Sequence, residues 1–352
     1  AGLTYATLTS PHFVRFNERI QLHGEAVSDD ALCGSFERVN QARYDAEGVA
    51  TALTYFEFNA LLAFDLMQRA NLDVAILEIG LGGRLDAVNL IDADVAVVTS
   101  ISVDHVDWLG NNIDLIGREK AGVYRAGKPA IVGAVDCPSS VADYAHEIGA
   151  QCLQNGVDFK LEANQWSNTA GLTMILPKVS LPPMNVAAAV QAVVSLSFEI
   201  EAADIAKGLA DARLMGRFQR LEWQGKQVIL DVAHNPQAAQ NLALELADEH
   251  CDGQTIAVLA MLGDKDYPQV INALSGSFDR WMLATSEGPR GLLSSELGQQ
   301  LSLNAVTDAQ FDTFNTPTEA FVAAIAEAAP ADRVIVFGSF VTVGEVLALV
   351  EG

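Results

Sequence analysis

Short apolar segments rich in β-branched residues alternate along the chain with longer amphipathic segments. Helical spacing marks Glu57–Ala70, Ile113–Tyr124, Ser140–Ile148, Gln237–Ala247 and Thr318–Ala328. The segments with the length and composition of buried strands are Tyr5–Thr9, Val74–Ile79, Val95–Ile101, Ala130–Gly133, Val228–Val232, Ile256–Leu262, Trp281–Ala284 and Val334–Phe337. This alternation predicts an α/β fold in which helices cover mostly parallel sheets.

The chain has 352 residues, which at about 150 residues per domain suggests two domains. Strand-like pieces separated by turn residues predict a β-hairpin insertion at 157–181. A glycine-containing joint, Leu214–Phe218, precedes a new unit that begins with a strand. We therefore expect a first domain over 1–215, a linker over 216–224 and a second domain over 225–352.

The amino-acid composition excludes some classes of protein and disfavours some kinds of binding partner. Hydrophobic residues make up 50% and charged residues 19%, which excludes a disordered chain or a coiled coil. The net charge of −24 disfavours partners such as nucleic acid and anionic membrane surfaces. Four cysteines without a Cys-x-x-Cys pair indicate reduced thiols in a cytoplasmic protein.

Two predicted strands end in residues that could bind a ligand. The first runs through Glu78 into a glycine-rich loop, Gly80–Gly83, but too few residues follow for the helix of a dinucleotide-binding unit. The second runs into Asp104 and His105. If these strands are neighbours, Glu78 and His105 converge at one sheet edge, where a carboxylate and an imidazole suit a divalent cation. The alternative is a tight turn with an incidental acid.

Two further segments are weak signals when each is taken alone. Gly117–Gly122 has the charges of a solvated helix face. Thr9–His12 also follows a strand, and Ser10 could either ligate a cation or cap a turn.

Asp231–Pro236 is a stronger signal. The Asn and Pro fit the first positions of a helix, whose N-terminus favours an anion. The alternative is an ordinary capped turn, but the added Asp and His favour a ligand-binding loop.

Together these segments resemble the Mur ligase superfamily and, within it, the bacterial bifunctional dihydrofolate synthase/folylpolyglutamate synthase family. The resemblance runs in order along the whole chain. It rests on 9–19, 53–57, 78–89, 99–110 and 117–122 in the first domain, and on 216–219, 231–236, 261–266 and 337–340 in the second. It implies a P-loop-type, mostly parallel sheet domain that lacks its N-terminal part, followed by a Rossmann-like glutamate-ligase domain.

The resemblance also implies roles for individual residues. The implied magnesium ligands are Ser10, Glu78 and His105, and the implied ATP-binding residues are Asn185, Arg217 and Asp231. Lys120 matches a lysine that the family carries as an N-carboxylated (carbamylated) side chain, and His234 lies in the loop that approaches the reacting carboxyl. The residues that match the pterin pocket are Thr54, Tyr55, Phe56, Glu57, Leu85, Asp86 and Ala87.

The implied reaction is the ATP-dependent addition of L-glutamate to dihydropteroate and to the γ-carboxyl of reduced folates, through an acyl phosphate. Its cofactors are ATP and Mg²⁺, with K⁺ or a second Mg²⁺ as a further option, and we expect a monomer. Two alternatives stay open. One is another Mur-type ligase acting on a cell-wall precursor, and the other is a non-catalytic binding protein for folate or nucleotide.

One departure from the family pattern concerns phosphate binding. The family carries a loop of the Gly-Thr-Asn-Gly-Lys-Gly-Ser type before the region that matches residues 1–20, and no Gly-Lys-Ser or Gly-Lys-Thr occurs in this sequence. Either the sequence is a fragment or the protein lacks the loop. Phosphoryl transfer needs backbone amides and a lysine around the β- and γ-phosphates. We therefore expect these 352 residues alone to bind ATP weakly and to form no acyl phosphate.

Overall fold

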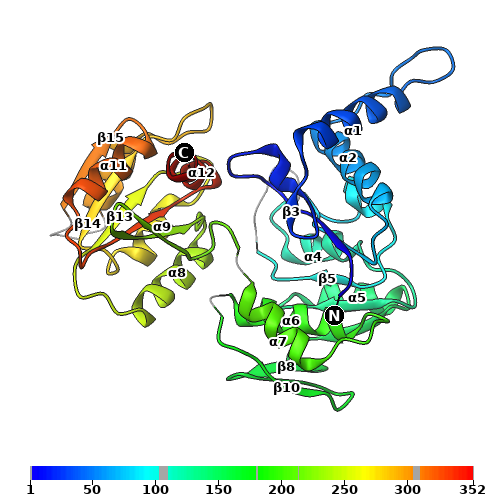
Figure 1. The fold of residues 1–352 in the computed structure, drawn as a ribbon. Coiled ribbons are helices and arrows are strands. Elements are labelled where there is room, and N and C mark those ends of the chain that lie inside the picture. Colours follow the sequence, from blue (N-terminus) through cyan, green and yellow to red (C-terminus); the bar gives the residue numbers. More distant parts are fainter. Residues whose placement is uncertain (1, 103–109, 180, 213, 304–309, 352) are drawn as a thin grey trace. The chain divides into compact units, whose positions relative to one another are not determined.

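The computed structural model describes residues 2–102, 110–179, 181–212, 214–303 and 310–351. The chain divides into two compact units, each with its own sheets and helices (Figure 1). Unit 1 comprises Ala1–Ser10 and Asn17–Ala212, and unit 2 comprises Pro11–Phe16 and Arg213–Gly352. The short segment Pro11–Phe16, which we expected in the first domain, thus groups with unit 2.

Unit 1 is built on separate small sheets. Parallel pairing joins β1 to β4, and β5 to β6 to β7, whereas β2, β3 and the strands β8 to β10 pair antiparallel. The strands are β1 (Tyr5–Leu8), β2 (Ile20–Leu22), β3 (Glu25–Ala26), β4 (Val74–Leu77), β5 (Ala96–Val98), β6 (Pro129–Val132), β7 (Gln151–Gln154), β8 (Phe159–Glu162), β9 (Gln165–Asn168) and β10 (Thr173–Ile175). Among the described residues, β4 and β5 lie in different sheets, so the direct neighbour of β4 is β1.

Three of the described helices of unit 1 begin at side chains that accept hydrogen bonds from their first amides. Ser28, Thr54 and Asn112 each accept a backbone N–H at the start of α1, α2 and α4. The helices are α1 (Asp29–Ala42), α2 (Tyr55–Arg69), α4 (Ile113–Ala121), α5 (Ser139–Glu147), α6 (Pro183–Val194) and α7 (Ala202–Asp211), with the short 3₁₀ helices η1 (Phe16–Arg19) and η2 (Ala87–Leu90). Between β4 and β5 the only helix is η2, as the short spacing predicts.

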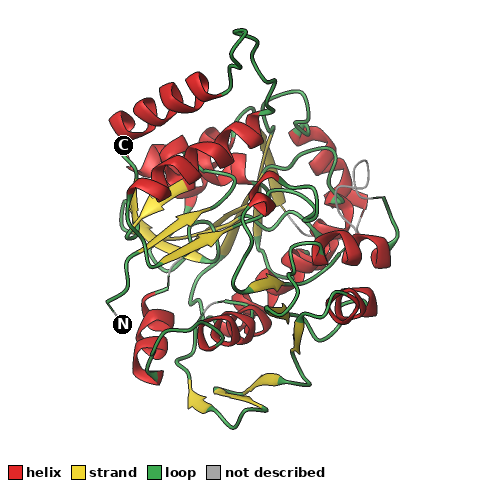
Figure 2. Cartoon of the chain, turned by 90° about the vertical axis from the view of Figure 1, so that its right-hand side faces the viewer, coloured by secondary structure: helices red, strands yellow, loops and turns green. Residues whose placement is uncertain are grey.

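The segment 157–181 contains the small antiparallel sheet β10-β9-β8 at the lower end of unit 1 in Figures 1 and 2. Phe159 and Trp166 are fully buried between this sheet and α6. The Trp166 Nε1 donates a hydrogen bond of 3.2 Å to the Ala187 carbonyl, which fixes the sheet to the helix.

Unit 2 is a six-stranded sheet of order β11-β12-β16-β13-β14-β15, parallel except for β11. Its strands are β11 (Gln219–Trp223), β12 (Lys226–Asp231), β13 (Thr255–Leu259), β14 (Arg280–Ala284), β15 (Gln310–Phe314) and β16 (Arg333–Phe337). Its helices are α8 (Pro236–Asp248), α9 (Tyr267–Leu274), α10 (Ser294–Leu303), α11 (Pro317–Glu327) and α12 (Phe340–Glu351). Alternate strand residues face α8, α9 and α10 on one side and α11 and α12 on the other. The sheet is therefore buried on both faces, as expected for a parallel sheet.

Residues 216–224, which we expected to be a linker, contain β11 instead. The reason is the turn at Gln224 and Gly225, whose φ angles of 50° and 71° match a two-residue hairpin turn that joins β11 to β12. The Trp-Gln-Gly-Lys sequence lacks the usual Asn-Gly signal, which is why the pattern did not reveal the hairpin. The α/β class with mostly parallel sheets is confirmed.

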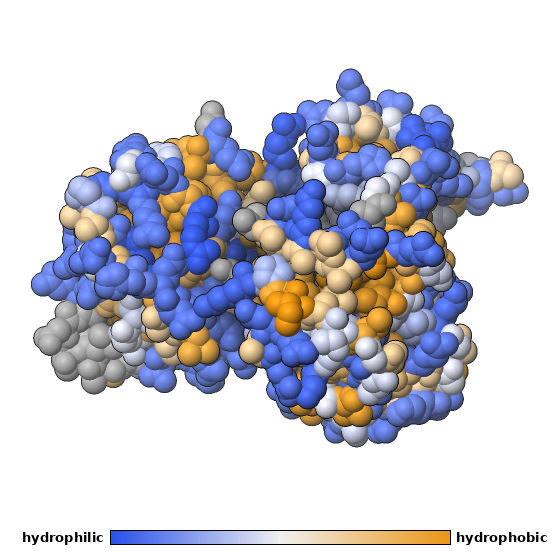
Figure 3. All heavy atoms as spheres, turned by 60° about the horizontal axis from the view of Figure 1, so that its bottom comes forward, coloured by the Kyte–Doolittle hydropathy of each residue, from blue (hydrophilic) through white to orange (hydrophobic). Residues whose placement is uncertain are grey.

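Hydrophilic side chains cover much of the surface drawn in Figure 3, with apolar residues scattered among them. In the part of the chain that the structure describes, every helix is too short or too polar to cross a membrane.

Candidate active site

Ser10 and Glu78 lie side by side at the carboxyl ends of two paired strands. In the parallel pair of β1 and β4, Leu8 lies opposite Leu77, so both strands end at the same edge of the sheet. The Ser10 amide donates a hydrogen bond of 2.7 Å to Glu78 Oε2, and the Glu78 amide donates one of 2.9 Å to the Leu8 carbonyl. The structure thus brings together two of the three predicted metal ligands. The third, His105, lies outside the described residues.

The glycine-rich loop after Glu78 is organised by Asp86. Its Oδ2 accepts the amides of Gly80 and Leu81 at 3.2 and 3.0 Å, and its Oδ1 accepts the amide of Val88 at 2.9 Å. Three hydrogen bonds to one carboxylate hold the loop in a single shape and start η2. The structural role of Asp86 is therefore clear, whereas its contact with a substrate stays a prediction.

The same loop packs against the end of α4, where Lys120 lies. A β-carbon on Gly83 would lie 2.7 Å from the Lys120 carbonyl oxygen, so only glycine allows this approach. The Arg84 amide donates to the Glu119 carbonyl at 3.0 Å, and the Arg84 guanidinium pairs with the Glu119 carboxylate, also at 3.0 Å. Lys120 is therefore held on a fixed helix end, one residue from an ion pair that joins α4 to the loop.

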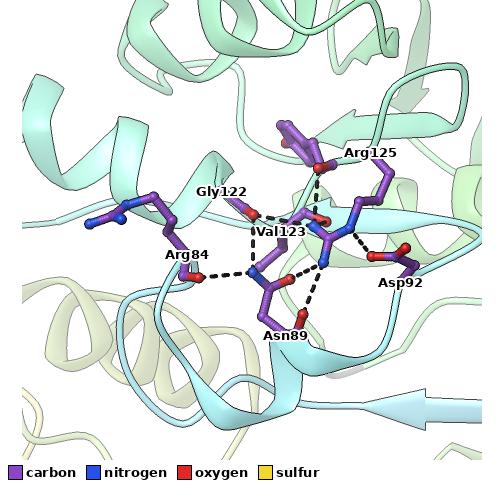
Figure 4. Close-up of polar contacts among 7 residues, drawn as sticks. Arg84, Asn89, Asp92, Gly122, Val123 and Arg125 are labelled. Atoms are coloured by element: carbon purple, nitrogen blue, oxygen red, sulfur yellow. Dashed lines mark hydrogen bonds and ion pairs between the residues drawn. The ribbon is translucent and has the colours of Figure 1, made fainter.

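Arg125 ties η2 to the turn after α4 (Figure 4). Its Nη1 donates to the carbonyls of Gly122, Val123 and Tyr124, and its Nη2 donates to both Asn89 oxygens at 2.9 Å. Asn89 Nδ2 in turn donates to the Arg84 and Gly122 carbonyls at 3.1 Å. The loop that carries Asp86 and the helix that carries Lys120 are thus one hydrogen-bonded frame.

Two of the predicted pterin-pocket residues, Thr54 and Glu57, form a capping box at the start of α2. The Thr54 amide donates to Glu57 Oε2 at 2.7 Å, and the Glu57 amide donates to Thr54 Oγ1 at 3.2 Å. These hydrogen bonds with Thr54 lower the pKa of the Glu57 carboxyl below its ordinary value. Both side chains therefore have a structural function, whether or not they also contact a substrate.

The apolar members of the predicted pocket lie around the same loop. Phe56 packs directly on Gly80, where a β-carbon would lie 2.3 Å from the ring. Tyr55 and Leu85 are 64% and 77% exposed, and Ala87 is half-buried. Exposed apolar side chains beside a rigid loop are suited to stacking against a flat ring system.

The predicted ATP-binding residues lie on both units. Asn185, in unit 1, is exposed in the first turn of α6. In unit 2, Asp231 ends β12, and its carboxylate accepts the amides of Phe218 and Ala233, each at 2.8 Å. Burial raises the pKa of the Asp231 carboxyl, while these hydrogen bonds and the Arg217 charge act against that shift.

His234 and Arg217 approach one aromatic ring in unit 2, that of Phe340. The Arg217 guanidinium lies 5.7 Å from the ring centre, and the imidazole of His234 lies 6.5 Å from it. His234 Nδ1 is 2.7 Å from the Val232 carbonyl. Because a carbonyl only accepts, Nδ1 is the donor in this contact, which leaves Nε2 as the acceptor whenever the ring is neutral.

The sequence did not assign roles to Phe340, Asn89 and Arg125. Phe340 follows the end of β16 and belonged to a motif already noted, so its position at a strand end was the available signal. Asn89 and Arg125 act through hydrogen bonds between segments 36 residues apart, for which a single sequence gives no signal.

The oxygen donors of Ser10 and Glu78 fit a magnesium ion. Mg²⁺ is commonly bound by one or two protein oxygens and completes its shell with water and substrate phosphates. Within the described residues, no group of three or more His, Cys, Asp or Glu side chains is arranged so that it could hold a metal ion. A site built on Ser10 and Glu78 therefore suits Mg²⁺ better than a metal that needs a full protein cage.

Comparison with known proteins shows the family to which the chain belongs. The family model for the Mur ligase glutamate ligase domain matches residues 216–340. Over 355 residues the chain is 41% identical to the dihydrofolate synthase/folylpolyglutamate synthase of Escherichia coli, covering 100% of this chain and 81% of that protein. The chain belongs to the dihydrofolate synthase/folylpolyglutamate synthase family.

Other members of the family agree in sequence and in fold. The Haemophilus influenzae member is 36% identical, with 99% of this chain and 83% of that protein covered. The structure of the E. coli member in complex with DHPP and ADP superposes with a TM-score of 0.91 at 41% identity, covering 100% of this chain and 83% of that one. A Yersinia pestis member complexed with AMPPNP and Mn gives a TM-score of 0.90 at the same identity and coverage. The Mur-ligase fold expected from the sequence is confirmed.

Proposed function

We propose that this protein adds L-glutamate to dihydropteroate and to the γ-carboxyl of reduced folates, using ATP. The observation that carries the proposal is the 41% identity along the whole chain to a bifunctional folate enzyme. Solved family members bind DHPP with ADP in one case, and Mn, AMPPNP and L-glutamate in another. The chain is a carbon–nitrogen ligase of this family, and its relatives favour a folate substrate over a cell-wall precursor.

Ser10 and Glu78 would hold the divalent ion of the reaction, and His105 is proposed as the third ligand. When bound, Mg²⁺ neutralises phosphate oxygens and stabilises the charge of phosphoryl transfer. The Ser10 amide restrains the Glu78 carboxylate, so the carboxylate can bind an ion without changing its orientation. Arg217, Asp231 and Asn185 are proposed to bind the nucleotide.

The pterin substrate is proposed to bind against Tyr55, Phe56 and Leu85, on the loop held by Asp86. The capping box fixes Thr54 and Glu57 at the start of α2, next to these side chains. Phosphorylation of the substrate carboxyl by ATP gives an acyl phosphate. The α-amine of L-glutamate then attacks its carbonyl carbon, and phosphate leaves as the amide forms.

Two residues are proposed to act near the reacting atoms. His234 is proposed to act as a base: in the ring's neutral form, with Nδ1 donating to the Val232 carbonyl, Nε2 can accept a proton of the attacking amine. Lys120 is proposed to be N-carboxylated: its neutral Nζ adds to CO₂ and releases a proton, which leaves a carbamate anion. The carbamate would replace the positive charge of Lys120, at the end of α4, by a negative charge that could bind a metal ion. The free thiols in the structure suit a cytoplasmic enzyme.

The test is a substrate panel with radiolabelled L-glutamate, run on a form of the protein extended by the glycine-rich Lys-Ser/Thr loop segment of the family. We expect label to enter dihydropteroate and reduced folates only with ATP and Mg²⁺, and not a cell-wall nucleotide precursor. Competition between dihydropteroate and a reduced folate would show that both use one site. If dihydropteroate neither reacts nor inhibits, the enzyme is a folylpolyglutamate synthase alone.

A further inference from the structure

The connection between β1 and β2 leaves unit 1 and returns to it. At its base the Thr9 amide donates a hydrogen bond of 2.9 Å to the Arg19 carbonyl, which closes a loop. The residues at the tip of this loop, Pro11–Phe16, group with unit 2, whereas the residues on either side group with unit 1. We name Pro11–Phe16 the anchoring loop.

Phe13 fixes the anchoring loop in unit 2. Its ring packs on Gly216, where a β-carbon would lie 2.6 Å away, and a β-carbon on Gly344 would lie 2.4 Å from the Phe13 carbonyl oxygen. The Phe13 ring also lies 5.0 Å from that of Phe340 and packs against the apolar cluster that includes Val232. The absence of a β-carbon at Gly216 and Gly344 thus leaves the space that the ring and the backbone of Phe13 occupy. This makes the position a specific packing site for Phe13.

The Phe340 ring lies between the packing site of Phe13 and the predicted functional residues of unit 2. The same ring faces the guanidinium of Arg217 and the imidazole of His234 at 5.7 and 6.5 Å. A displacement of Phe13 would therefore change the packing of the ring that both of these side chains contact.

The two ends of the loop lie at the candidate site of unit 1. Ser10 directly precedes the anchoring loop, and its amide is bound to Glu78 at 2.7 Å. On the other side, the buried Arg19 places its guanidinium 5.7 Å from the centre of the Tyr55 ring. Only two residues separate Ser10 from Phe13, which spans at most about 10 Å of chain.

We propose that Phe13 is a positioning residue, which anchors the loop in unit 2 and thereby fixes Ser10 against Glu78 in unit 1. The relevance of this link to catalysis rests on the proposed function, but the link itself does not. Because Ser10 is joined to Phe13 by a short stretch of chain, release of the ring gives the Ser10 amide freedom to leave Glu78.

The test is hydrogen exchange of backbone amides, resolved to single residues, in the full chain without ligands. Phe13→Ala removes the anchor, and we expect the Ser10 amide to exchange roughly fivefold faster, the effect of weakening one charge-assisted hydrogen bond. Phe13→Leu keeps part of the packing and is expected to restore most of the protection. Unchanged exchange at Ser10 in Phe13→Ala would overturn the proposal.

A second variant displaces the loop without altering it. Gly344→Ala places a methyl group against the Phe13 carbonyl, and we again expect faster exchange at Ser10. The matched control is Gly276→Ala, also in unit 2, where a β-carbon meets nothing within 4 Å. Amides of β13 report whether the core of unit 2 is intact. Faster exchange at Ser10 in the control as well would mean that any change in unit 2 has this effect, and would overturn the specific role of Phe13.

Direct binding of Mn²⁺, measured by electron paramagnetic resonance, tests separately whether Ser10 and Glu78 bind the metal. A failure of this test would therefore not be confused with a failure of the link between Phe13 and Ser10. We expect the Mn²⁺ dissociation constant to rise several-fold in Phe13→Ala and to stay unchanged in Gly276→Ala. Faster exchange at Ser10 with unchanged Mn²⁺ affinity would support the link and contradict the role of Ser10 as a metal ligand.

Discussion

The backbone amide of Ser10 donates a 2.7 Å hydrogen bond to the carboxylate of Glu78, across 68 residues of sequence. The parallel pairing of β1 with β4 creates this contact, since both strands end at the same edge of the sheet. A carboxylate that accepts a backbone amide is restrained in orientation, which favours its use as a metal ligand.

The first prediction concerns this carboxylate. Here and in the predictions that follow, activity and KM are measured on the form extended by the glycine-rich Lys-Ser/Thr loop segment of the family. Glu78→Gln keeps an acceptor for the Ser10 amide but removes the negative charge, so the strand ends should stay in place while metal binding is lost. We expect glutamate incorporation to fall roughly 100-fold and a higher Mg²⁺ concentration to be needed. Glu162→Gln, an exposed carboxylate of β8, is the control and should leave both quantities unchanged. Normal Mg²⁺ dependence in Glu78→Gln would rule out this residue as a ligand.

The second prediction concerns the loop held by Asp86. Asp86→Ala leaves the amides of Gly80, Leu81 and Val88 without their acceptor. We expect a loss of about 1–3 kcal/mol in the free energy of unfolding and a raised KM for dihydropteroate. Urea unfolding and steady-state kinetics measure the two effects. A raised KM without any loss of stability would instead indicate direct contact with the substrate.

The third prediction uses the contact between Phe56 and Gly80. Gly80→Ala places a β-carbon 2.3 Å from the ring and must displace it. If Phe56 lines the pterin pocket, the KM for dihydropteroate should rise about tenfold while the KM for ATP stays the same. Gly208→Ala in α7, where a β-carbon meets nothing within 4 Å, is the matched control, and should be neutral or slightly stabilising. Equal changes in both KM values would contradict a local effect on the pocket.

The fourth prediction tests the frame around Lys120. Arg125→Lys replaces a planar guanidinium that serves several carbonyls with a single ammonium group. We expect a loss of about 2 kcal/mol in the free energy of unfolding and lower activity. Because Asn89 belongs to the same network, the combined effect of Asn89→Ala and Arg125→Lys in a double-mutant cycle should be smaller than the sum of the two single effects. Full additivity would show that the two side chains act independently.

The fifth prediction concerns the pH dependence of stability. Burial raises the pKa of Glu245 on α8 from its ordinary 4.5 to about 7, and the nearby Asp231 and Glu249 charges act in the same direction while Arg220 opposes them. The folded state therefore holds this proton more tightly than the unfolded state. The contribution to stability is complete below about pH 4.5 and is lost as the pH rises to about 7.

Glu245→Gln should remove this dependence. At pH 8 we expect the variant to be more stable than the natural chain by about 1 kcal/mol, a value reduced for the partial exposure of the group. The advantage should disappear at pH 4.5, as urea unfolding at the two pH values would show. Asp248→Asn, which changes an exposed carboxylate on the same helix, is the control and should show no such difference. A constant advantage at both pH values would mean that packing rather than titration causes it.

Much of the fold could be predicted because its strands and helices carry strong local signals. Val334–Phe337 and Ile256–Leu262 are apolar runs of strand length, and Asn235-Pro236 marks the start of α8 as expected. The hairpin of β11 and β12 was missed since its turn uses Gln224 in the left-handed region. The grouping of Pro11–Phe16 with unit 2 depends on contacts with Gly216 and Gly344, which no local pattern encodes.

The candidate site could be predicted only in part. The strand-end positions of Glu78 and Ser10 are visible in the sequence, but their pairing depends on β1 lying next to β4 rather than β4 next to β5. Lys120 looked like part of a solvated helix face, and only the resemblance to a family gave it a role. The structural functions of Thr54, Glu57 and Asp86 emerged from hydrogen bonds that composition and spacing do not show.

This protein is proposed to join L-glutamate to a pterin carboxylate with hydrolysis of ATP to ADP and phosphate. The direct measurement is phosphate release together with incorporation of labelled glutamate into dihydropteroate, for the 352 residues alone and for a form extended by the glycine-rich Lys-Ser/Thr loop segment of the family. We predict one phosphate released per glutamate added in the extended form, and no acyl phosphate from the 352 residues alone. Absence of glutamate incorporation from the extended form, with folding intact, would contradict the proposed function. Robust turnover by the 352 residues would contradict the account of phosphate binding.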